Sequence, residues 1–324
     1  MDVRPTTIPE LRTLEGTVFP QVLSPVGSDV DLEKTLAWLE DHQAFLREQL
    51  LVSGAILLRG FPLAHARDFD AVVRAGGFLG MPYIGGAAPR SDVLKGRILT
   101  TNESPPSEPI PFHHEMSQVP QPPAYVLFYC DVPSDQGGET PIVLSSRVYD
   151  RFRAISPEFA DKLEAEGVRY VRVMPPEDDN SSPIGRSWKA TFLCDTREEA
   201  EARMEELGME WRWLDGNALH TVTRALPAIR TDGRTGCKTF FNSMVAAYTG
   251  WVDSRNDPTR SVRFGDDSAM DGDVLLRTAE AMTEECVAFR WQQGDVLLID
   301  NALVMHSRRP FAGPRRILAS IARA

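Results

Sequence analysis

Hydrophobic residues recur at helical spacing near the start of the chain. Leucine and phenylalanine side chains follow this spacing between residues 31 and 50, which is typical of an amphipathic helix with one buried face. The apolar run GAILLRGFP (54–62) predicts a buried strand, and the helical pattern after it ends near Gly76 and Gly77. This helix–strand–helix opening is the only part of the chain that clearly predicts α/β structure.

The rest of the chain predicts short strands separated by turns and loops. A helix is expected in SPEFADKLEAEG, with Ser156 as its N-cap and Pro157 as its first residue, and another over 196–207. Strands are expected in AYVLFYCDV (124–132), PIVLSS, VRYVRVM, KTFFNSMVA (238–246), DVLLIDN (295–301) and RRILASIAR (315–323). The pattern therefore predicts a mainly β fold, a sandwich or jelly roll with α-helical additions and a few helices at its start.

No composition shift marks a domain boundary, so residues 1–324 are expected to form a single domain. The polar segment of about 175–235 lies between the halves of the predicted core. We expect it to be an insertion that forms a lid.

Charge and cysteine usage exclude several classes of partner. The net charge is −11, so neither nucleic acid nor an anionic membrane surface is an expected partner. Neither a signal peptide nor a membrane-spanning run is visible, which predicts a cytoplasmic protein. Reduced thiols are expected in place of a disulfide framework, because the cysteines are far apart: Cys130, Cys194, Cys237 and Cys286.

The segment PFHHEMSQ contains a candidate pair of metal ligands. If residues 112–116 are extended, His113 and Glu115 point to one side and His114 points to the other. A metal ion would then take one imidazole and one carboxylate from this strand, and it would need a further ligand from elsewhere.

Three other histidines are candidates for the remaining ligand. His65 and His220 lie in polar segments, whereas His306 follows a buried-looking strand and precedes the arginine-rich segment SRRPFAGPRR. We favour His306. Two imidazoles and a carboxylate on one face are the ligand set of non-haem Fe(II) oxygenases, which leaves open coordination positions.

The closing strand adds a cation. Arg315 and Arg316 follow His306 closely, and alternation along the strand places Arg316, Leu318 and Ser320 on one face. A guanidinium group can hold a carboxylate through two hydrogen bonds. An arginine near the iron could therefore bind the far end of a keto acid.

These motifs together resemble the TauD/TfdA group of Fe(II)/2-oxoglutarate-dependent oxygenases. The similarity is strongest to the subgroup of clavaminate-synthase-like and syringomycin-biosynthesis hydroxylase-like proteins, in which glutamate replaces aspartate as the carboxylate ligand. The matching segments, in family order, are PFHHEMSQ, DQGGETPIVLSSRVYDRF, GDVLLIDNALVMHSRRPF and GPRRILASIAR.

The resemblance implies a double-stranded β-helix, the jelly roll, with Fe(II), 2-oxoglutarate and O2 as cofactor and cosubstrates. It implies His113, Glu115 and His306 as iron ligands. It further implies that Thr140 and Arg316 bind the distal carboxylate of 2-oxoglutarate, with Arg315 as the alternative if the strand register differs by one residue.

The resemblance also implies a substrate class. The subgroup acts largely on amino acids, peptides or carrier-bound aminoacyl groups in natural-product biosynthesis, and hydroxylation is the expected outcome. The candidates for holding such a small substrate are Arg90, Asn102, Arg172 and Asn242. The sequence leaves the oligomeric state open.

Three alternatives remain open at this stage. The first is the same oxygenase performing desaturation or cyclisation. The second is a non-haem iron enzyme of the same fold that does not use 2-oxoglutarate. The third is a metal-free jelly-roll binding protein.

Overall fold

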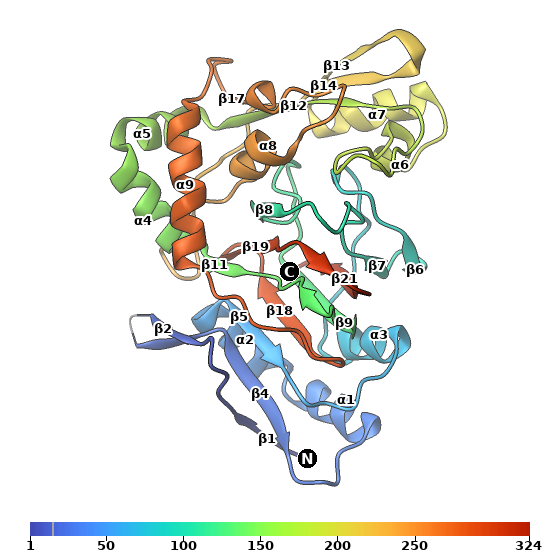
Figure 1. The fold of residues 1–324 in the computed structure, drawn as a ribbon, viewed down its shortest axis with the longest axis vertical. Helices are drawn as coiled ribbons and strands as arrows, with labels where there is room; N and C mark the ends of the chain where they lie inside the picture. Colours follow the sequence, from blue (N-terminus) through green and yellow to red (C-terminus); the bar gives the residue numbers. More distant parts are fainter. Residues whose placement is uncertain (15) are drawn as a thin grey trace.

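A computed structural model describes residues 1–14 and 16–324, and its centre is an eight-stranded sheet (Figure 1). β4 and β5 run parallel, whereas the other neighbouring strands are antiparallel. In order across the sheet, the strands are β1 (Asp2–Pro5), β4 (Gln21–Val26), β5 (Ala55–Leu58), β18 (Val296–Asp300), β9 (Tyr125–Val132), β21 (Arg316–Ala322), β7 (Ile98–Thr100) and β6 (Asp92–Leu94). The sheet thus joins the beginning, middle and end of the chain.

A second, three-stranded sheet packs on one face of the large sheet. It consists of β11 (Ile142–Leu144), β19 (Val304–Arg308) and β8 (Ile110–His113), in that order. Phe128, Leu297 and Ile317 of the large sheet share one apolar cluster with Ile142 and Val304 of the smaller sheet. Two facing sheets with a common core are the arrangement that the strand pattern predicts.

Helices α1 (Leu32–Asp41), α2 (Gln43–Ser53) and α3 (Ala66–Ala75) cover the other face of the large sheet (Figure 1). The helix expected over 31–50 is divided into α1 and α2 at His42, whose ring nitrogen Nδ1 lies 2.8 Å from the Trp38 carbonyl oxygen. The end of α3 falls at the predicted glycines.

A second group of helices contains α4 (Ser145–Ile155), α5 (Pro157–Glu166), α8 (Met244–Gly250) and α9 (Gly272–Glu285). The Ser156 hydroxyl accepts a hydrogen bond from the Phe159 amide, as expected for the N-cap of α5. The helices expected at the start are α1, α2 and α3, whereas α4, α8 and α9 are helices that the sequence reasoning did not identify.

The prediction of a strand over 238–246 is wrong. Only β16 (Lys238–Thr239) forms there, and α8 begins at Met244. The Asn242 side chain accepts a hydrogen bond from the Met244 amide, so the polar pair Asn242–Ser243 turns the chain into the helix.

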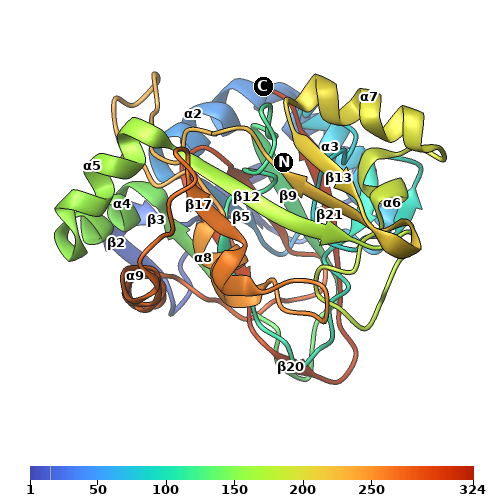
Figure 2. The same ribbon diagram turned by 90° about the horizontal axis from the view of Figure 1, so that it is seen from above.

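A four-stranded sheet lies above the core in Figure 1. Its order is β13 (Glu210–Trp213), β14 (Leu219–Val222), β12 (Val168–Met174) and β17 (Val262–Phe264). Figure 2 shows β12 running between α4, α5 and α9 on one side and α6 (Trp188–Phe192) and α7 (Arg197–Leu207) on the other. The helix predicted over 196–207 is α7, and Thr196 and Glu199 form its capping box.

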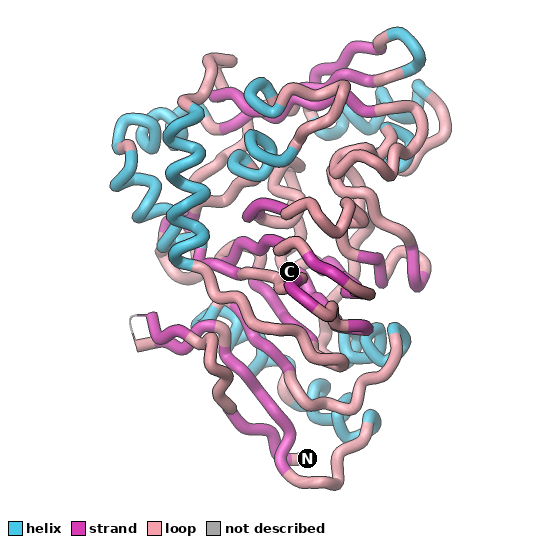
Figure 3. Tube along the Cα trace, in the orientation of Figure 1, coloured by secondary structure: helices cyan, strands magenta, loops and turns pink. Residues whose placement is uncertain are grey.

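Loops connect this upper sheet to the core (Figure 3). The remaining short elements are β2 (Arg12–Leu14), β3 (Thr17–Phe19), β10 (Gln136–Gly137), β15 (Arg230–Thr231), β20 (Phe311–Ala312) and the 3-10 helices η1 (Asp215–Asn217) and η2 (Pro258–Arg260). Among the residues that the structure describes, none of the helices combines the length and apolar character needed to cross a membrane.

Candidate metal centre

Three potential metal ligands meet at the edge of the smaller sheet. His113 ends β8 and His306 lies in β19, where the two residues are direct cross-strand partners with ring centroids 4.4 Å apart. Glu115 follows in the next turn, and its Oε2 lies 3.5 Å from Nε2 of His306. One ligand atom from each residue lies within 4.8 Å of the other two, so a single ion can contact all three.

The His113 imidazole is prepared to act as a neutral ligand. Nδ1 of His113 donates to the Pro111 carbonyl oxygen at 2.9 Å, which leaves the lone pair of Nε2 free for a metal. Burial, and then repulsion by His306, lowers the pKa of His113 to about 4. His113 is therefore neutral at physiological pH, as metal ligation requires.

The backbone turns sharply between the first two ligands. β8 ends at His113 and a turn begins at Glu115, so the conformation is not extended over 112–116 as expected. His114 still points away from the cluster, because its Nδ1 donates to the Asn301 carbonyl oxygen at 2.6 Å and its Nε2 lies 2.8 Å from the Ser145 hydroxyl. Both of its ring nitrogens are therefore occupied.

Asn301 fixes this turn. Its Oδ1 accepts from the Glu115 amide at 2.9 Å, and its Nδ2 donates to the carbonyl oxygens of Glu115 at 3.0 Å and Pro123 at 2.8 Å. The side chain is fully buried at the end of β18. The sequence reasoning missed Asn301, since only the folded chain brings it beside a segment so distant in sequence.

Arg90 is the counter-ion of the carboxylate. Its Nη2 lies 3.0 Å and 2.8 Å from the two oxygens of Glu115, and both side chains are almost completely buried. Burial opposes ionisation of Glu115, but Arg90 and the two imidazoles outweigh it and lower the pKa of that carboxyl group. Glu115 is therefore an anion, which is the state that binds a cation.

A cavity opens over the cluster. Its wall contains His113, Glu115 and His306, and it also contains Thr140 and Arg315. The Arg315 guanidinium is largely buried, and its Nε donates to the Gly138 carbonyl oxygen at 2.9 Å. Thr140 accepts a hydrogen bond from Nε1 of Trp291 at 3.1 Å. A hydroxyl group and a buried cation thus face the same space as the three ligands.

The glycine pair before Thr140 allows the Arg315 side chain to lie close to the backbone of this segment. Gly138 has a φ of +72°, and a Cβ atom there would lie 2.9 Å from Cδ of Arg315. Any larger residue would therefore be strained and would also displace the arginine.

Arg316 lies elsewhere, contrary to the register expected from the sequence. Its side chain is half exposed and forms an ion pair with Asp131 at 2.9 Å. The residues of β21 that face the metal cluster are the odd-numbered ones, Ile317 and Ala319, whereas Leu318 packs under the N-terminal helices. A bulge between Arg316 and Ile317 shifts the pairing with β9, and Arg315 is the arginine that lines the cavity.

The other candidates divide into two groups. Arg90 and Asn102 line the cavity, whereas Arg172 and Asn242 do not. Asn242 is fully buried, and its Nδ2 donates to the Ala228 carbonyl oxygen at 3.1 Å, so its contacts are structural. His65 caps α3 and His220 lies in β14, and neither joins the ligand cluster.

The structure also shows cavity residues that sequence reasoning missed, among them Tyr83, Trp251 and Arg308. Arg308 donates to the carbonyl oxygens of Asn102, Ser104, Pro105 and Glu108 and so fixes the loop before β8.

The donor set and its surroundings fit one class of site. Two imidazoles and one carboxylate, gathered at the end of a cavity with room beside them, match the facial ligand set of non-haem iron oxygenases. The chain belongs to the taurine catabolism dioxygenase TauD, TfdA family, whose model matches residues 16–321. This match confirms the predicted enzyme class and, with it, the cofactor set of iron and 2-oxoglutarate.

Individual relatives agree with this assignment. A clavaminate synthase-like protein of Arabidopsis thaliana is 49% identical over 321 residues, which cover 98% of this chain and 97% of the relative. The dapdiamide synthesis protein DdaC of Enterobacter agglomerans is 26% identical over 288 residues, covering 85% and 83% of the two chains.

The fold also matches solved structures. PvcB, described as an Fe, alpha-ketoglutarate dependent oxygenase from an isonitrile synthetic pathway, superposes with a TM-score of 0.52 at 15% identity, covering 94% of this chain and 86% of that chain. The predicted jelly-roll architecture with helical additions is confirmed.

Proposed function

We propose that His113, Glu115 and His306 hold Fe(II), that Thr140 and Arg315 bind the distal carboxylate of 2-oxoglutarate, and that the enzyme hydroxylates a small amino-acid-like substrate. One observation supports this most directly. The three ligand atoms, a buried guanidinium and a hydroxyl group line the same cavity.

Iron and 2-oxoglutarate, when bound, supply with O2 the oxidising power needed to attack an unactivated C–H bond. The chain itself positions the bound molecules and shields the site from water. Arg315 fixes one end of the keto acid through charge-assisted hydrogen bonds, and Thr140 adds a hydroxyl contact. Phe128 packs against the His306 ring at 5.0 Å and keeps water from that side of the cluster.

The retained carboxylate favours hydroxylation over halogenation, because Glu115 occupies the position that a halide would need. Desaturation and cyclisation use the same site and are alternatives that only product analysis can separate. A metal-free binding protein is disfavoured, since a ligand cluster with a buried Arg90 counter-ion has no purpose in such a protein.

The substrate class is inferred from the polar groups of the cavity. Beside its ion pair with Glu115, Arg90 keeps Nε and Nη1 without hydrogen-bond partners among the described residues, and Asn102 offers an amide. These groups suit the carboxylate and ammonium groups of an amino acid, free or carrier-bound. DdaC is named for the synthesis of dapdiamide, which supports a role in natural-product biosynthesis. The single-domain organisation, a lid over 175–235 and a cytoplasmic location remain predictions.

A screen of amino acids, free and attached to a carrier protein, tests the substrate class. The readout is succinate release above the level seen without substrate. We expect stimulation by at least one amino-acid-like compound, together with a hydroxylated product. Stimulation only by compounds without an amino-acid group would contradict the proposed substrate class but not the iron site.

A further inference from the structure

A second cavity adjoins the metal cavity. Ala87, Gln118 and Trp251 line both, so the two spaces share a wall. The second cavity lies between β12, β14 and the α6–α7 region, and its remaining lining is largely apolar, with Val119, Met174, Phe192, Leu207, Met209 and Leu226.

One buried cation lines this apolar space. Arg172 of β12 is 6% exposed, and its Nη2 donates to the carbonyl oxygens of Ile184 at 2.8 Å and Arg186 at 2.9 Å. Its Nε is buried and has no hydrogen-bond partner among the described residues. A buried guanidinium without a paired anion is costly, so the site is chemically incomplete as it stands.

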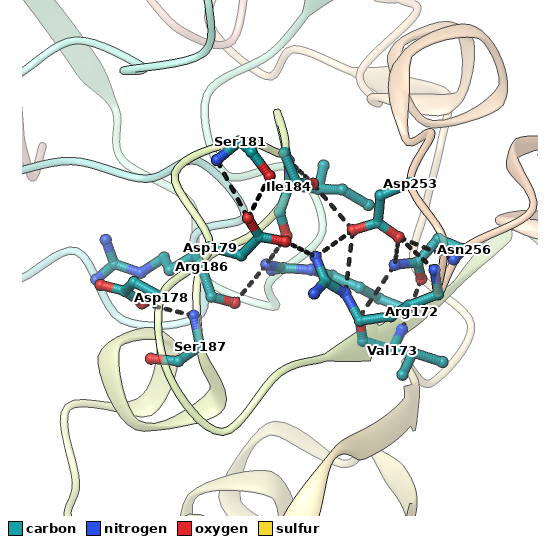
Figure 4. A network of polar contacts seen from close by, with 12 residues as sticks. Arg172, Val173, Asp178, Asp179, Ser181, Ile184, Arg186, Ser187, Asp253 and Asn256 are labelled. Carbon is teal, nitrogen blue, oxygen red and sulfur yellow. Dashed lines mark hydrogen bonds and ion pairs between the residues drawn. The ribbon is translucent and has the colours of Figure 1, made fainter. Parts of the chain in front are cut away.

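The neighbouring carboxylates do not neutralise Arg172 (Figure 4). Asp179 and Asp253 are both bound by Arg255, at 2.8 Å and 2.5 Å. Asp253 also accepts from the Ser182 hydroxyl at 2.9 Å. Across the described part of the chain, Arg172 therefore has no ion pair, although two acidic residues belong to the same network.

A second polar group in the same wall is also without a partner. The Thr191 hydroxyl of α6 is buried, lines this cavity, and forms no hydrogen bond with the described residues. Arg224 also lines this cavity but is exposed, so Arg172 is its buried charge. One buried positive charge and one free hydroxyl group within largely apolar walls are complementary to a single carboxylate attached to an apolar body.

We propose that the second cavity binds an apolar chain that ends in a carboxylate, and that Arg172 is the counter-ion of that carboxylate. This inference rests on the proposed function in one respect: the ligand is the distal end of the oxidised substrate. Its other end extends past Trp251 to the metal centre. Arg172 also bonds the carbonyl of Ile184, which lines the metal cavity, so the same contact couples the two spaces.

Calorimetric titration of the full-length protein tests the site directly, with octanoate as the probe and butyrate and octan-1-ol as comparisons. The titrations are run without metal and again under anaerobic conditions with Fe(II) and saturating 2-oxoglutarate, which occupies Arg315. We expect octanoate to bind in both states. Butyrate should bind at least about tenfold more weakly, because each buried methylene contributes about fourfold. Octan-1-ol should also bind at least about tenfold more weakly, because it lacks the charge.

Arg172→Gln should weaken octanoate binding by about 10- to 100-fold. Arg169→Gln is the matched control, since Arg169 is a buried arginine of the same strand that is paired with Glu210 and Asp267 and does not line the cavity. It should leave octanoate affinity within about twofold. Leu207→Trp fills the cavity while Arg172 itself is retained, and it should also abolish octanoate binding, even if Arg172→Gln fails to fold.

The outcomes separate this inference from the proposed function. The proposal is overturned if octanoate does not bind, if it binds no more tightly than butyrate or octan-1-ol, or if neither Arg172→Gln nor Leu207→Trp weakens its binding. Arg172 would then only stabilise the 178–187 loop. Octanoate binding without any sign of Fe(II) and 2-oxoglutarate binding would instead overturn the proposed function and keep the site.

Discussion

His113 and His306 face each other across the pairing of β8 and β19, with their ring centroids 4.4 Å apart, although they are almost two hundred positions apart in the chain. Directly opposed residues on paired strands keep a nearly fixed separation. The proposed metal site is therefore built into the sheet, and of its three residues only Glu115 depends on a turn.

The position of Arg315 predicts a difference between two adjacent arginines. Arg315→Ala should weaken 2-oxoglutarate binding by about 10- to 100-fold, because a buried charge-assisted contact to a carboxylate is lost. Arg316→Ala should leave the affinity nearly unchanged, since that side chain lies on the surface with Asp131. Anaerobic titration with 2-oxoglutarate measures both, and the reverse order would show that the register assigned to β21 is wrong.

Arg90 predicts a stability effect that depends on the metal. Arg90→Met leaves the buried Glu115 carboxylate without its cation, which should destabilise the metal-free protein by about 3 kcal/mol. A bound divalent ion replaces the lost charge, so Mn(II) should restore much of the melting temperature. Thermal unfolding with and without Mn(II) provides the measurement.

Arg59→Met is the control for this prediction. Arg59 pairs with the buried Asp295 at 2.6 Å, and neither residue lines the metal cavity. Its loss should lower the melting temperature to a similar degree with or without added Mn(II). Equal responses of the two variants to Mn(II) would contradict the role given to Arg90.

Asn301 should tolerate even an isosteric change poorly. Asn301→Asp removes the two donated hydrogen bonds and introduces a buried charge, which should lower the free energy of unfolding by about 3 kcal/mol. Metal affinity should fall as well, because the turn that carries Glu115 loosens. Asn180→Asp, at an exposed position, is the control, and denaturant unfolding compares the two.

Thiol reactivity should distinguish the core from the surface. Burial raises the pKa of Cys130 to about 12, so its thiolate is scarce at pH 8 and its side chain is inaccessible. Cys237 is exposed and should give the fast phase of labelling by a thiol reagent. Cys237→Ser should remove that phase. Rapid labelling of Cys130 in the folded protein would show that the sheet is less closed than described.

The pattern of polar and apolar residues was sufficient to predict those helices and strands whose local sequence signals agree with their surroundings in the fold. The largely apolar run of β21 and the capped helices α5 and α7 lie where the sequence predicts them. The segment 238–246 failed because its apolar residues fit a strand and a buried helix equally well, and the turn at Asn242 decided the outcome.

The site was predictable to the extent that it depends on residue type. The proposed ligand histidines and carboxylate follow from motifs. Arg316 was favoured because it matches the family motif, whereas Arg315 shares a face of β21 with Ile317 and Ala319 and lines the cavity. Asn301 and Arg308 act through contacts between distant segments, and a single sequence carries no signal for such contacts.

The most direct test of the central claim is anaerobic addition of Fe(II) and 2-oxoglutarate. The family resemblance predicts a weak visible charge-transfer band near 500 nm under these conditions. We expect the band in the unchanged protein and in His220→Ala, and its loss in His306→Ala. A band that survives in His306→Ala would contradict the assignment of His113, Glu115 and His306 as the ligands of one iron ion.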